Sequence, residues 1–384
     1  HIPIATGLLG PDGADLVGTR VLELTEPEQA FVFDGIEDEP VPSLLRGFSA
    51  PVRLRFEGGT DAQLAHLLAH DPDPFHRWEA GQVLAKKVVL PMVEAFHEGE
   101  TPAVPAHLVD AVRSTLTAEG LDPSLQAAAL RLPDEATLGS ELPVDRPVSL
   151  HRARWHVVQT LALELLHEFE EVYTRHTLDG PYRHHPADAG HRRLRNLALG
   201  YLATLHEEET TARCVAQFQA ADNMTDQIAA LACLASIPGD ECDQALAAFY
   251  EQWKDVPLVV DKWFAVQSFA DREDTPERVA DLWHHPAMDA RNPNKVRAVV
   301  STFCHNRAAF HRADGAGYRW AADRLLELDP LNPMVAARAA GAFTSWRRYD
   351  DARQTQMREQ LERIAGQEGL SRDLYEIVHR SLEG

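Results

Sequence analysis

Cysteine is scarce in this chain. The 384 residues contain only four, and no two of them form a CxxC pair: Cys214, Cys233, Cys242 and Cys304. This scarcity excludes a disulfide-bonded scaffold and a zinc ribbon, because both need cysteines at close and repeated spacing. The alanine- and phenylalanine-containing surroundings are typical of buried thiols in a reducing compartment. We therefore expect a cytoplasmic protein.

Long apolar runs and an excess of basic residues are also missing. No run approaches the roughly 20 apolar residues of a membrane helix, and the start at His1 has no signal-peptide pattern. The chain has 37 Lys and Arg against 59 Asp and Glu, which gives a formal net charge of −22. Nucleic acids and anionic membranes select basic patches. Neither is expected as a partner.

The motifs of a self-contained catalytic centre are absent as well. There is no GxxxxGK[ST] phosphate loop and no GxSxG nucleophile elbow. The His-Glu pairs at His97, His167 and His206 lack the second histidine of an HExxH zinc helix. The clusters RHHPADAGH (183–191) and WHHP (283–286) do not place two histidines four apart beside a general base. We expect no catalytic and no metal-binding residues in this chain.

What is present begins with strands. Alternating apolar residues occur in IPIATGLL, RVLEL, AFVF and PVRLRF, with GPDG as a turn and TEPEQ as the loop of a hairpin between RVLEL and AFVF. The pattern predicts about four strands. A sheet this small buries too little apolar surface by itself, so we expect an incomplete β-sandwich. We assign residues 1–57 to this partial β-sandwich domain.

Helical patterns dominate after Gly58 and Gly59. The stretch WHVVQTLALELLHEFEEVY (155–173) places apolar residues three or four apart, which predicts one amphipathic helix, and RRLRNLALGYLATL (192–205) repeats the pattern. Pro-containing dipeptides separate the helical stretches. We assign residues 58–384 to one α-helical domain.

The last third of the chain has a regular spacing. Helices are expected to start at Asn223, Pro257, Pro293 and Pro333, because each is a capping or first-turn residue. The steps of 34, 36 and 40 residues are typical of paired-helix repeats. The fold class is therefore mainly α: a C-terminal α-superhelical domain preceded by a partial β-sandwich.

Four charged residues recur at equivalent positions of these repeats. Asp261 and Lys262 lie four and five residues after Pro257, Arg297 lies four after its proline, and Arg338 lies five after its own. Equivalent positions of a solenoid face the same way, so these charges are expected to share one wall. They form either structural ion pairs between helices or the lining of a chamber in which arginine binds a carboxylate or a carbonyl.

The whole chain resembles the bacterial-type aminopeptidase N family, zinc metallo-aminopeptidases of the gluzincin class. The stretch FVFDGIEDEPVPSLLRGFSAPVRL (31–54) resembles the segment that joins the family's small β-sandwich to its helical domain. The resemblance continues in order through FHRWEAGQ (75–82), ADNMTDQIAAL (221–231), LVVDKWFAVQ (258–267), NPNKVRAVVSTF (292–303), AAFHRADGAGY (308–318), NPMVAAR (332–338), RRYDDARQ (347–354) and LSRDLYE (370–376). Where the family reads NNMTD, this chain has Asp222 at the first position.

The resemblance implies a fragment of a larger enzyme. Such enzymes carry their GxMEN motif and zinc helix upstream of the matched region, so zinc is expected in the parent enzyme and no cofactor in this chain, which alone should be inactive. The helical domain would cap the active-site chamber and control the access of peptide substrates. Its partner would be the catalytic domain of the same polypeptide. The family's two chamber-facing arginines match Arg297 and Arg338, with Asp261 and Lys262 as further candidate lining residues from the repeat spacing.

A free-standing helical-repeat scaffold that binds a partner protein in its groove is the alternative. Such a scaffold should begin with a capping repeat, whereas this chain begins with strands.

Overall fold

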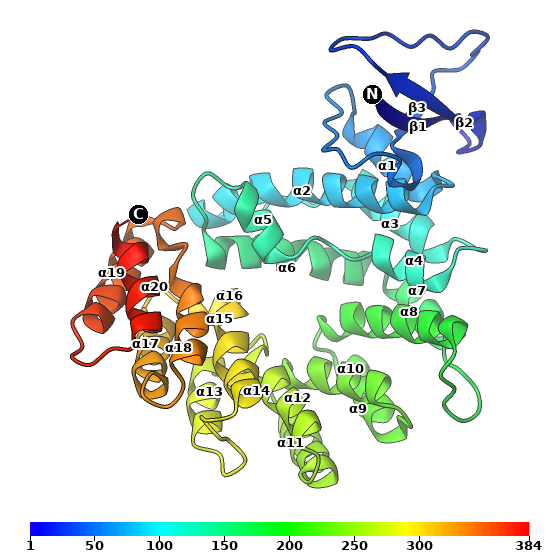
Figure 1. The fold of residues 1–384 in the computed structure, drawn as a ribbon. Coiled ribbons are helices and arrows are strands. Elements are labelled where there is room, and N and C mark those ends of the chain that lie inside the picture. The colour runs from blue at the N-terminus through cyan, green and yellow to red at the C-terminus, as the bar shows by residue number, and fades with distance from the viewer. Residues whose placement is uncertain (384) are drawn as a thin grey trace. The chain divides into compact units, whose positions relative to one another are not determined.

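The structure is a computed structural model that describes residues 1–383 (Figure 1). The chain forms two compact units. The first contains His1–Asp134 and His156–Leu205, and the second contains Glu135–Trp155 and the chain from His206 onward. Helix α6 (Pro147–Glu164) contributes residues to both units. Strands precede the helices along the chain, and the expected mainly α fold class is confirmed.

The first unit begins with a three-stranded antiparallel sheet in the order β2-β1-β3. Its strands are β1 (Ile2–Leu9), β2 (Asp15–Leu24) and β3 (Val41–Leu44). The GPDG turn joins β1 to β2: the Gly10 N–H donates to the Ala14 carbonyl (2.8 Å), and Gly13 has a φ of +82°, which glycine adopts without strain. The second half of β1 is buried and forms the centre of the sheet.

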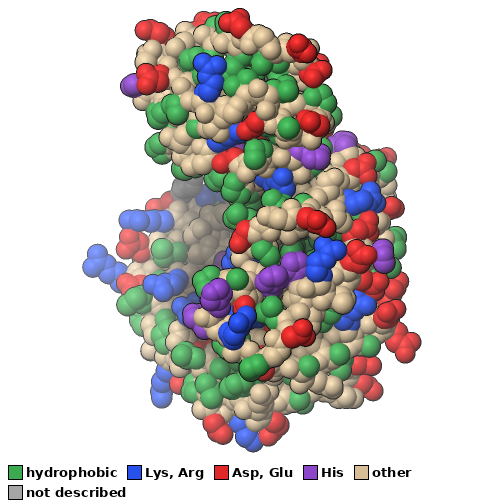
Figure 2. All heavy atoms as spheres, turned by 90° about the vertical axis from the view of Figure 1, so that its right-hand side faces the viewer, with side chains coloured by type: hydrophobic (Ala, Val, Ile, Leu, Met, Phe, Trp, Pro, Cys, Tyr) green, Lys and Arg blue, Asp and Glu red, His purple; other side chains and the backbone are tan. Residues whose placement is uncertain are grey.

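Two of the expected strands are wrong. AFVF and PVRLRF have no strand structure, so the hairpin between RVLEL and AFVF does not exist, and VPSL pairs with β1 instead. Alternation records which side chains suit a pleated surface, but a strand also needs a hydrogen-bonded neighbour. Neither segment has one among residues 1–383. Val32 is accordingly 78 % exposed, and hydrophobic side chains lie between acidic ones over this part of the molecule, at the top of Figure 2.

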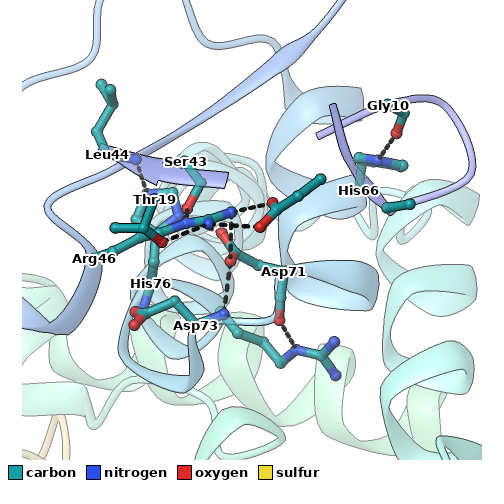
Figure 3. A network of polar contacts seen from close by, with 12 residues as sticks. Gly10, Thr19, Ser43, Leu44, Arg46, His66, Asp71, Asp73 and His76 are labelled. Carbon is teal, nitrogen blue, oxygen red and sulfur yellow. Dashed lines mark hydrogen bonds and ion pairs between the residues drawn. The ribbon is translucent and has the colours of Figure 1, made fainter. Parts of the chain in front are cut away.

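A buried arginine joins the sheet to the first helices (Figure 3). Arg46 is 5 % exposed. Its guanidinium donates to both carboxylate oxygens of Asp15 (2.7 and 3.0 Å) and to the Ser43 hydroxyl (2.8 Å). Asp71, which follows the first helix, lies 3.7 Å from the same guanidinium and also contacts His76 Nδ1 (2.7 Å). Such a buried cation is stable only while these partners stay in place.

Gly7 leaves room for this arginine, and its replacement by alanine is expected to destabilise the first unit by roughly 2 kcal/mol. A Cβ at position 7 would lie 2.1 Å from the Arg46 Cζ, so the guanidinium would have to leave Asp15. Thermal denaturation of Gly7→Ala measures the effect. Gly18→Ala, in β2, is the matched control because its Cβ would meet nothing within 4 Å. Equal stability of the two variants would contradict the prediction.

The helices of the first unit pack pairwise, α1 on α2 and α3, α4 on α8, and α7 on α8. The short 3₁₀ turn η1 (Arg46–Phe48) precedes them. Besides the second half of α6, they are α1 (Asp61–His70), α2 (Pro74–Glu98), α3 (Ala106–Thr117), α4 (Pro123–Ala129), α7 (Leu166–Arg175) and α8 (Pro186–Ala203).

The expectation of one helix over 155–173 is wrong. The chain forms α6 and α7, separated at Leu165, whose φ of −120° is not helical. Leu161, Leu165 and Phe169 are all fully buried, so the apolar spacing continues through the break. Periodicity reports which side is buried and not whether the backbone is continuous.

The second unit consists of helices and short helical turns. They are α5 (Glu135–Glu141), the first half of α6, α9 (Glu208–Ala220), α10 (Met224–Ala235), α11 (Asp240–Trp253), α12 (Pro257–Ser268), α13 (Thr275–Trp283), α14 (Pro293–Val296), the π-helical turn η2 (Arg297–Ser301), α15 (Thr302–His305), α16 (Arg307–Phe310), α17 (Ala316–Leu328), α18 (Pro333–Ala340), η3 (Gly341–Phe343), η4 (Trp346–Arg348), α19 (Asp351–Ala365) and α20 (Arg372–Glu383).

These helices form two packed rows. One row, here called the α12 row, runs from α10 through α12, then α14 with η2, to α18 and α20, each packed on the next. In the other row α9 packs on α11, α13 on α17, and α17 on α19, and helices of the two rows pack against each other. The rows can be followed through the green to red helices of Figure 1. This is the arrangement of a helical-repeat array.

The four expected helix starts are confirmed. Helices α12, α14 and α18 begin at Pro257, Pro293 and Pro333, where the missing proline N–H leaves no helical hydrogen bond unmade. Helix α10 begins after Asn223, whose side chain accepts from the Asp226 N–H (3.0 Å). All four lie in the α12 row. The sequence spacing therefore marks one layer of the array.

Candidate functional site

The charged residues expected to share a wall lie on three neighbouring helical elements of the α12 row. Asp261 and Lys262 are on α12, Arg297 is the first residue of η2, and Arg338 is on α18. Helix α12 packs on η2, and η2 packs on α18. The structure thus brings the three cations onto adjacent elements of one layer.

Arg297 is exposed and sits at the start of a π turn. One of its Nη2 hydrogens is donated to the Asn294 amide oxygen (2.8 Å), and the Thr302 hydroxyl donates to the Arg297 carbonyl (3.1 Å). Isolated π turns are uncommon and frequently occur at functional sites. This turn was not predicted from the sequence. The available signal was the local concentration of β-branched residues, Val299, Val300 and Thr302, which are less favourable in an α-helix.

Arg338 and Lys262 are exposed cations without partners. Neither side chain has a hydrogen bond or an ion pair anywhere in residues 1–383. Arg338 projects from a helix of small residues in which Ala336, Ala339 and Ala340 are buried. In a chain with a net charge of −22, three cations thus lie on neighbouring elements, and none of them is paired with a carboxylate.

Asp261 differs from the three cations because its carboxylate is already engaged. It contacts Lys295 Nζ (3.2 Å), and both side chains are largely buried. The Lys295 ammonium also lies 5.4 Å from the centre of the Phe264 ring. This ion pair joins α12 to α14. For Asp261, the side chain therefore forms a structural ion pair between helices, one of the two interpretations drawn from the sequence. The free charge on these helices is therefore positive.

Two exposed apolar side chains accompany the cations, and sequence reasoning missed them. Leu258 is 68 % and Met334 65 % exposed, and each follows directly after the first proline of its helix. Leu258 lies four residues before Lys262, and Met334 four before Arg338, so each apolar residue and its cation share a helix face. Asn294 holds the equivalent place before Arg297. These six residues, Leu258, Lys262, Asn294, Arg297, Met334 and Arg338, are called the cation–apolar face below.

The histidine-rich segment 183–191 has a structural arrangement. Asp188 accepts two hydrogen bonds from Arg183 (both 2.9 Å), and His185 Nδ1 accepts from the Ala187 N–H (3.3 Å). His191 Nδ1 lies 2.8 Å from Nδ1 of His176. Over residues 1–383, no three His, Cys, Asp or Glu side chains are grouped as metal ligands would be.

No helix in the same residues has the length and apolar character to cross a bilayer.

A second cluster of titratable groups lies within the second unit. His151 on α6 donates from both ring nitrogens, with Nδ1 2.9 Å from the Glu135 carboxylate and Nε2 3.2 Å from that of Asp271. Burial alone would lower the pKa of His151, but hydrogen bonds to Asp271 and Glu135 raise it to about 10. The imidazolium is thus held between two carboxylates and joins α5 and α6 to the segment that follows α12. It is a structural clamp and is not part of the cation–apolar face.

Comparison with known proteins extends this picture. Residues 61–383 match a family described as a domain of unknown function (DUF3458_C) with ARM repeats, and residues 1–57 match a family described as a domain of unknown function (DUF3458) with an Ig-like fold.

Several relatives have names. The chain is 38% identical to aminopeptidase N of Caulobacter vibrioides over 98% of its length and 36% identical to aminopeptidase N of Escherichia coli over 100%. A crystal structure of Legionella pneumophila aminopeptidase A in complex with aspartic acid matches 99% of the chain with a TM-score of 0.85 and 32% identity. The chain spans less than half of each relative: 44%, 45% and 45% of their lengths.

The resemblance expected from the sequence motifs is confirmed by these relatives. The chain belongs to the ARM-repeat family DUF3458_C, in the part of the chain that carries the cation–apolar face.

Proposed function

We propose that this chain is the C-terminal part of a zinc-dependent aminopeptidase N that releases N-terminal amino acids from peptides. In this proposal the chain caps the active-site chamber and controls the access of peptides. Its partner is the catalytic domain of the same polypeptide. The relatives support this proposal, because those named here are aminopeptidases and this chain covers less than half of each. The scaffold alternative has no comparable support, and the four free cysteines favour a reducing, cytoplasmic location.

The zinc of such an enzyme does not fit this chain. Residues 1–383 offer no grouping of three ligand side chains, so the hydrolytic chemistry has to be supplied outside it. This chain's own residues can bind and orient a peptide. No step at the metal is assigned to them.

The observation that carries the proposal is the unpaired positive charge of Lys262, Arg297 and Arg338. A peptide whose N-terminus lies at a distant reaction centre presents carbonyl groups and a C-terminal carboxylate at its other end. Arginine binds such groups by charge-assisted hydrogen bonds, each contributing about 1.5–3 kcal/mol. A cation that is not engaged by the protein's own carboxylates is available for this purpose.

Arg338→Ala in the full-length parent enzyme is expected to lower kcat/KM for tetra-alanine about tenfold. Hydrolysis of alanine anilide should change by less than about twofold, because this substrate has no distant carboxylate. The melting temperature should stay the same, since an exposed cation without a partner leaves nothing unpaired when it is removed.

Arg193→Ala is the matched control, because Arg193 is another exposed arginine without a partner in residues 1–383, on α8. It should change neither substrate's kinetics. A lowered melting temperature of Arg338→Ala with unchanged kinetics for both substrates would instead identify Arg338 as a structural residue.

A further inference from the structure

Two of the four cysteines lie together in the second unit. Cys214 on α9 is fully buried, and Cys233 on α10 is partly exposed. Their thiols form a hydrogen bond, and this contact together with burial raises the pKa of the Cys214 thiol well above its ordinary range. The nearby guanidinium of Arg213 acts in the opposite direction. Neither thiol belongs to the cation–apolar face or contacts His151.

A helix hairpin holds the two thiols next to each other. Only residues 221–223 separate α9 from α10, so the two helices run antiparallel and pack side by side (Figure 1). The Gln217 side chain donates to the Asp226 carbonyl across the hairpin (3.0 Å). Cys214 lies three residues before Gln217, and Cys233 lies seven after Asp226. These helical spacings place both cysteines on the contacting faces.

A hydrogen-bonded thiol pair is close to the geometry of a disulfide. The two sulfur atoms have to approach to about 2.05 Å, which rotation of the cysteine side chains and a small approach of the helices can supply. Helix α10 has the sequence MTDQIAALACLA, and its many alanines allow a neighbouring helix to come close. The hairpin can therefore close this bond without unfolding.

We propose that Cys214 and Cys233 form a reversible disulfide by exchange with a low-molecular-weight disulfide such as oxidised glutathione, and that this bridge fastens α9 to α10. Such a pair stays reduced in a reducing compartment and is bridged only when the compartment becomes oxidising. One reversible bridge is distinct from the disulfide-bonded scaffold that the small number of cysteines excludes. The proposal does not depend on the proposed function.

The exposure of the two thiols sets the order of the exchange. Cys233 attacks first, because solvent reaches its thiol and does not reach that of Cys214. The Cys233 thiolate forms a bond to one sulfur of oxidised glutathione, the glutathione S–S bond breaks, and one glutathione leaves as a thiolate. Cys214 then gives its proton to solvent and attacks the Cys233 sulfur, which releases the second glutathione thiolate.

The atoms and electrons of this exchange balance. Two protein thiols are oxidised, and one glutathione disulfide is reduced to two thiols that take up the two protons. The first step also prepares the second. Once Cys233 is bound to glutathione, its thiol no longer raises the pKa of Cys214, and only burial still does.

Peptide mapping of the full 384-residue chain tests the proposal. The chain is incubated with oxidised glutathione in the absence of denaturant and quenched with acid, and the remaining thiols are alkylated. A protease that cleaves before aspartate separates Cys214 from Cys233 at Asp226, and Cys233 from Cys242 at Asp240. Each pairing of cysteines therefore gives a different cross-linked peptide in the mass spectrum.

We expect a cross-link between Cys214 and Cys233 and none that includes Cys242 or Cys304, which lie on α11 and α15. Cys233 should react with oxidised glutathione at least about tenfold faster than Cys304, because burial raises the pKa of the Cys304 thiol to about 12. The bridged chain should melt about 5 °C higher than the reduced chain, since the bridge restricts residues 214–233 in the unfolded state. Dithiothreitol should reverse both changes.

Serine variants separate the roles of the two thiols. Cys214→Ser should keep a stable glutathione adduct on Cys233, because no second thiol is left to release the glutathione. Cys233→Ser should leave Cys214 reduced, because that thiol is buried. Cys304→Ser is the matched control and should form the bridge as the wild-type chain does.

Two results would overturn the proposed bridge: both thiols staying reduced unless the chain is denatured, or a glutathione adduct on Cys233 of the wild-type chain that persists without a cross-link. An unchanged melting temperature of the bridged chain would contradict the fastening of α9 to α10.

Discussion

Gly317→Ala is expected to destabilise the second unit by about 3 kcal/mol, the upper end of the usual range for overpacking of a core. Gly317 lies in α17, where helix propensity alone would favour alanine by about 1 kcal/mol. However, its Cβ would lie 2.3 Å from the carbonyl oxygen of Phe310 and 2.9 Å from that residue's Cα. The obstacle is backbone, which cannot rotate away as a side chain can. The close approach of α16 and α17 therefore makes the substitution destabilising, although helix propensity alone would make it stabilising.

Gly200→Ala on α8 is the matched control for this substitution. Gly200 is also a helical glycine, but a Cβ there would meet nothing within 4 Å. Its replacement should raise stability by about 0.5–1 kcal/mol. The two melting temperatures should move in opposite directions. If Gly317→Ala were as stable as Gly200→Ala, the packing of α17 on α16 described here would be wrong.

His151→Ala is expected to lower the free energy of unfolding by about 3 kcal/mol at pH 7. The substitution leaves the carboxylates of Glu135 and Asp271 facing a largely buried space without their cation. Removing one partner of a buried ion pair costs more free energy than the intact pair contributes, because the remaining charges are neither paired nor solvated. Denaturant unfolding followed in the second unit measures the loss. Adding Asp271→Asn to His151→Ala should recover part of it, because one uncompensated charge is then gone.

The pH dependence gives a second test of the same clamp. The pKa of His151 is raised from its ordinary value to about 10 in the folded chain. The stabilisation is therefore complete below pH 6.5, where folded and unfolded chains are both protonated, and is lost as the pH rises through about 10. The stability difference between the wild-type chain and His151→Ala should narrow steadily as the pH rises from about 6.5 to about 10. His167→Ala, which removes an exposed histidine beside Glu171, should have little effect at any pH.

The helix starts could be predicted from the sequence because their signals are local. A proline at the first helical position, or an asparagine whose side chain accepts an N–H three residues later, acts within one turn of its own helix. The sheet could not be predicted in this way. AFVF consists of residues that mostly favour strands, yet whether it pairs depends on the backbone available beside it. VPSL pairs with β1 instead, although it contains a proline. The helix break at Leu165 could not be predicted either, because the spacing of buried apolar residues continues through the break.

The candidate site was predictable in part. Counting from the prolines selected Lys262, Arg297 and Arg338, and the exposed cations do lie on successive elements of one row. The same count could not predict the ion pair between Asp261 and Lys295, because that contact joins two different helices. The count also did not select Leu258 and Met334. Apolar residues in a helix are expected to be buried in the core, and only the structure shows that these two are exposed. Their spacing of four residues from a cation was the available signal.

The π turn η2 also makes the length of the chain adjustable at this point. A π turn holds one residue more than an α turn, so it behaves as a single inserted residue within a helix. The wider turn takes up the extra residue, and the helix before it stays in phase with the helix after it. Lys295, buried before the turn, and Phe303, buried after it, can therefore both keep their places. Deleting one residue between Arg297 and Thr302 would return the segment to α geometry without turning α14 relative to α15. The extra residue thus changes the backbone beside Arg297, whose carbonyl accepts from the Thr302 hydroxyl, while both anchored ends remain where they are.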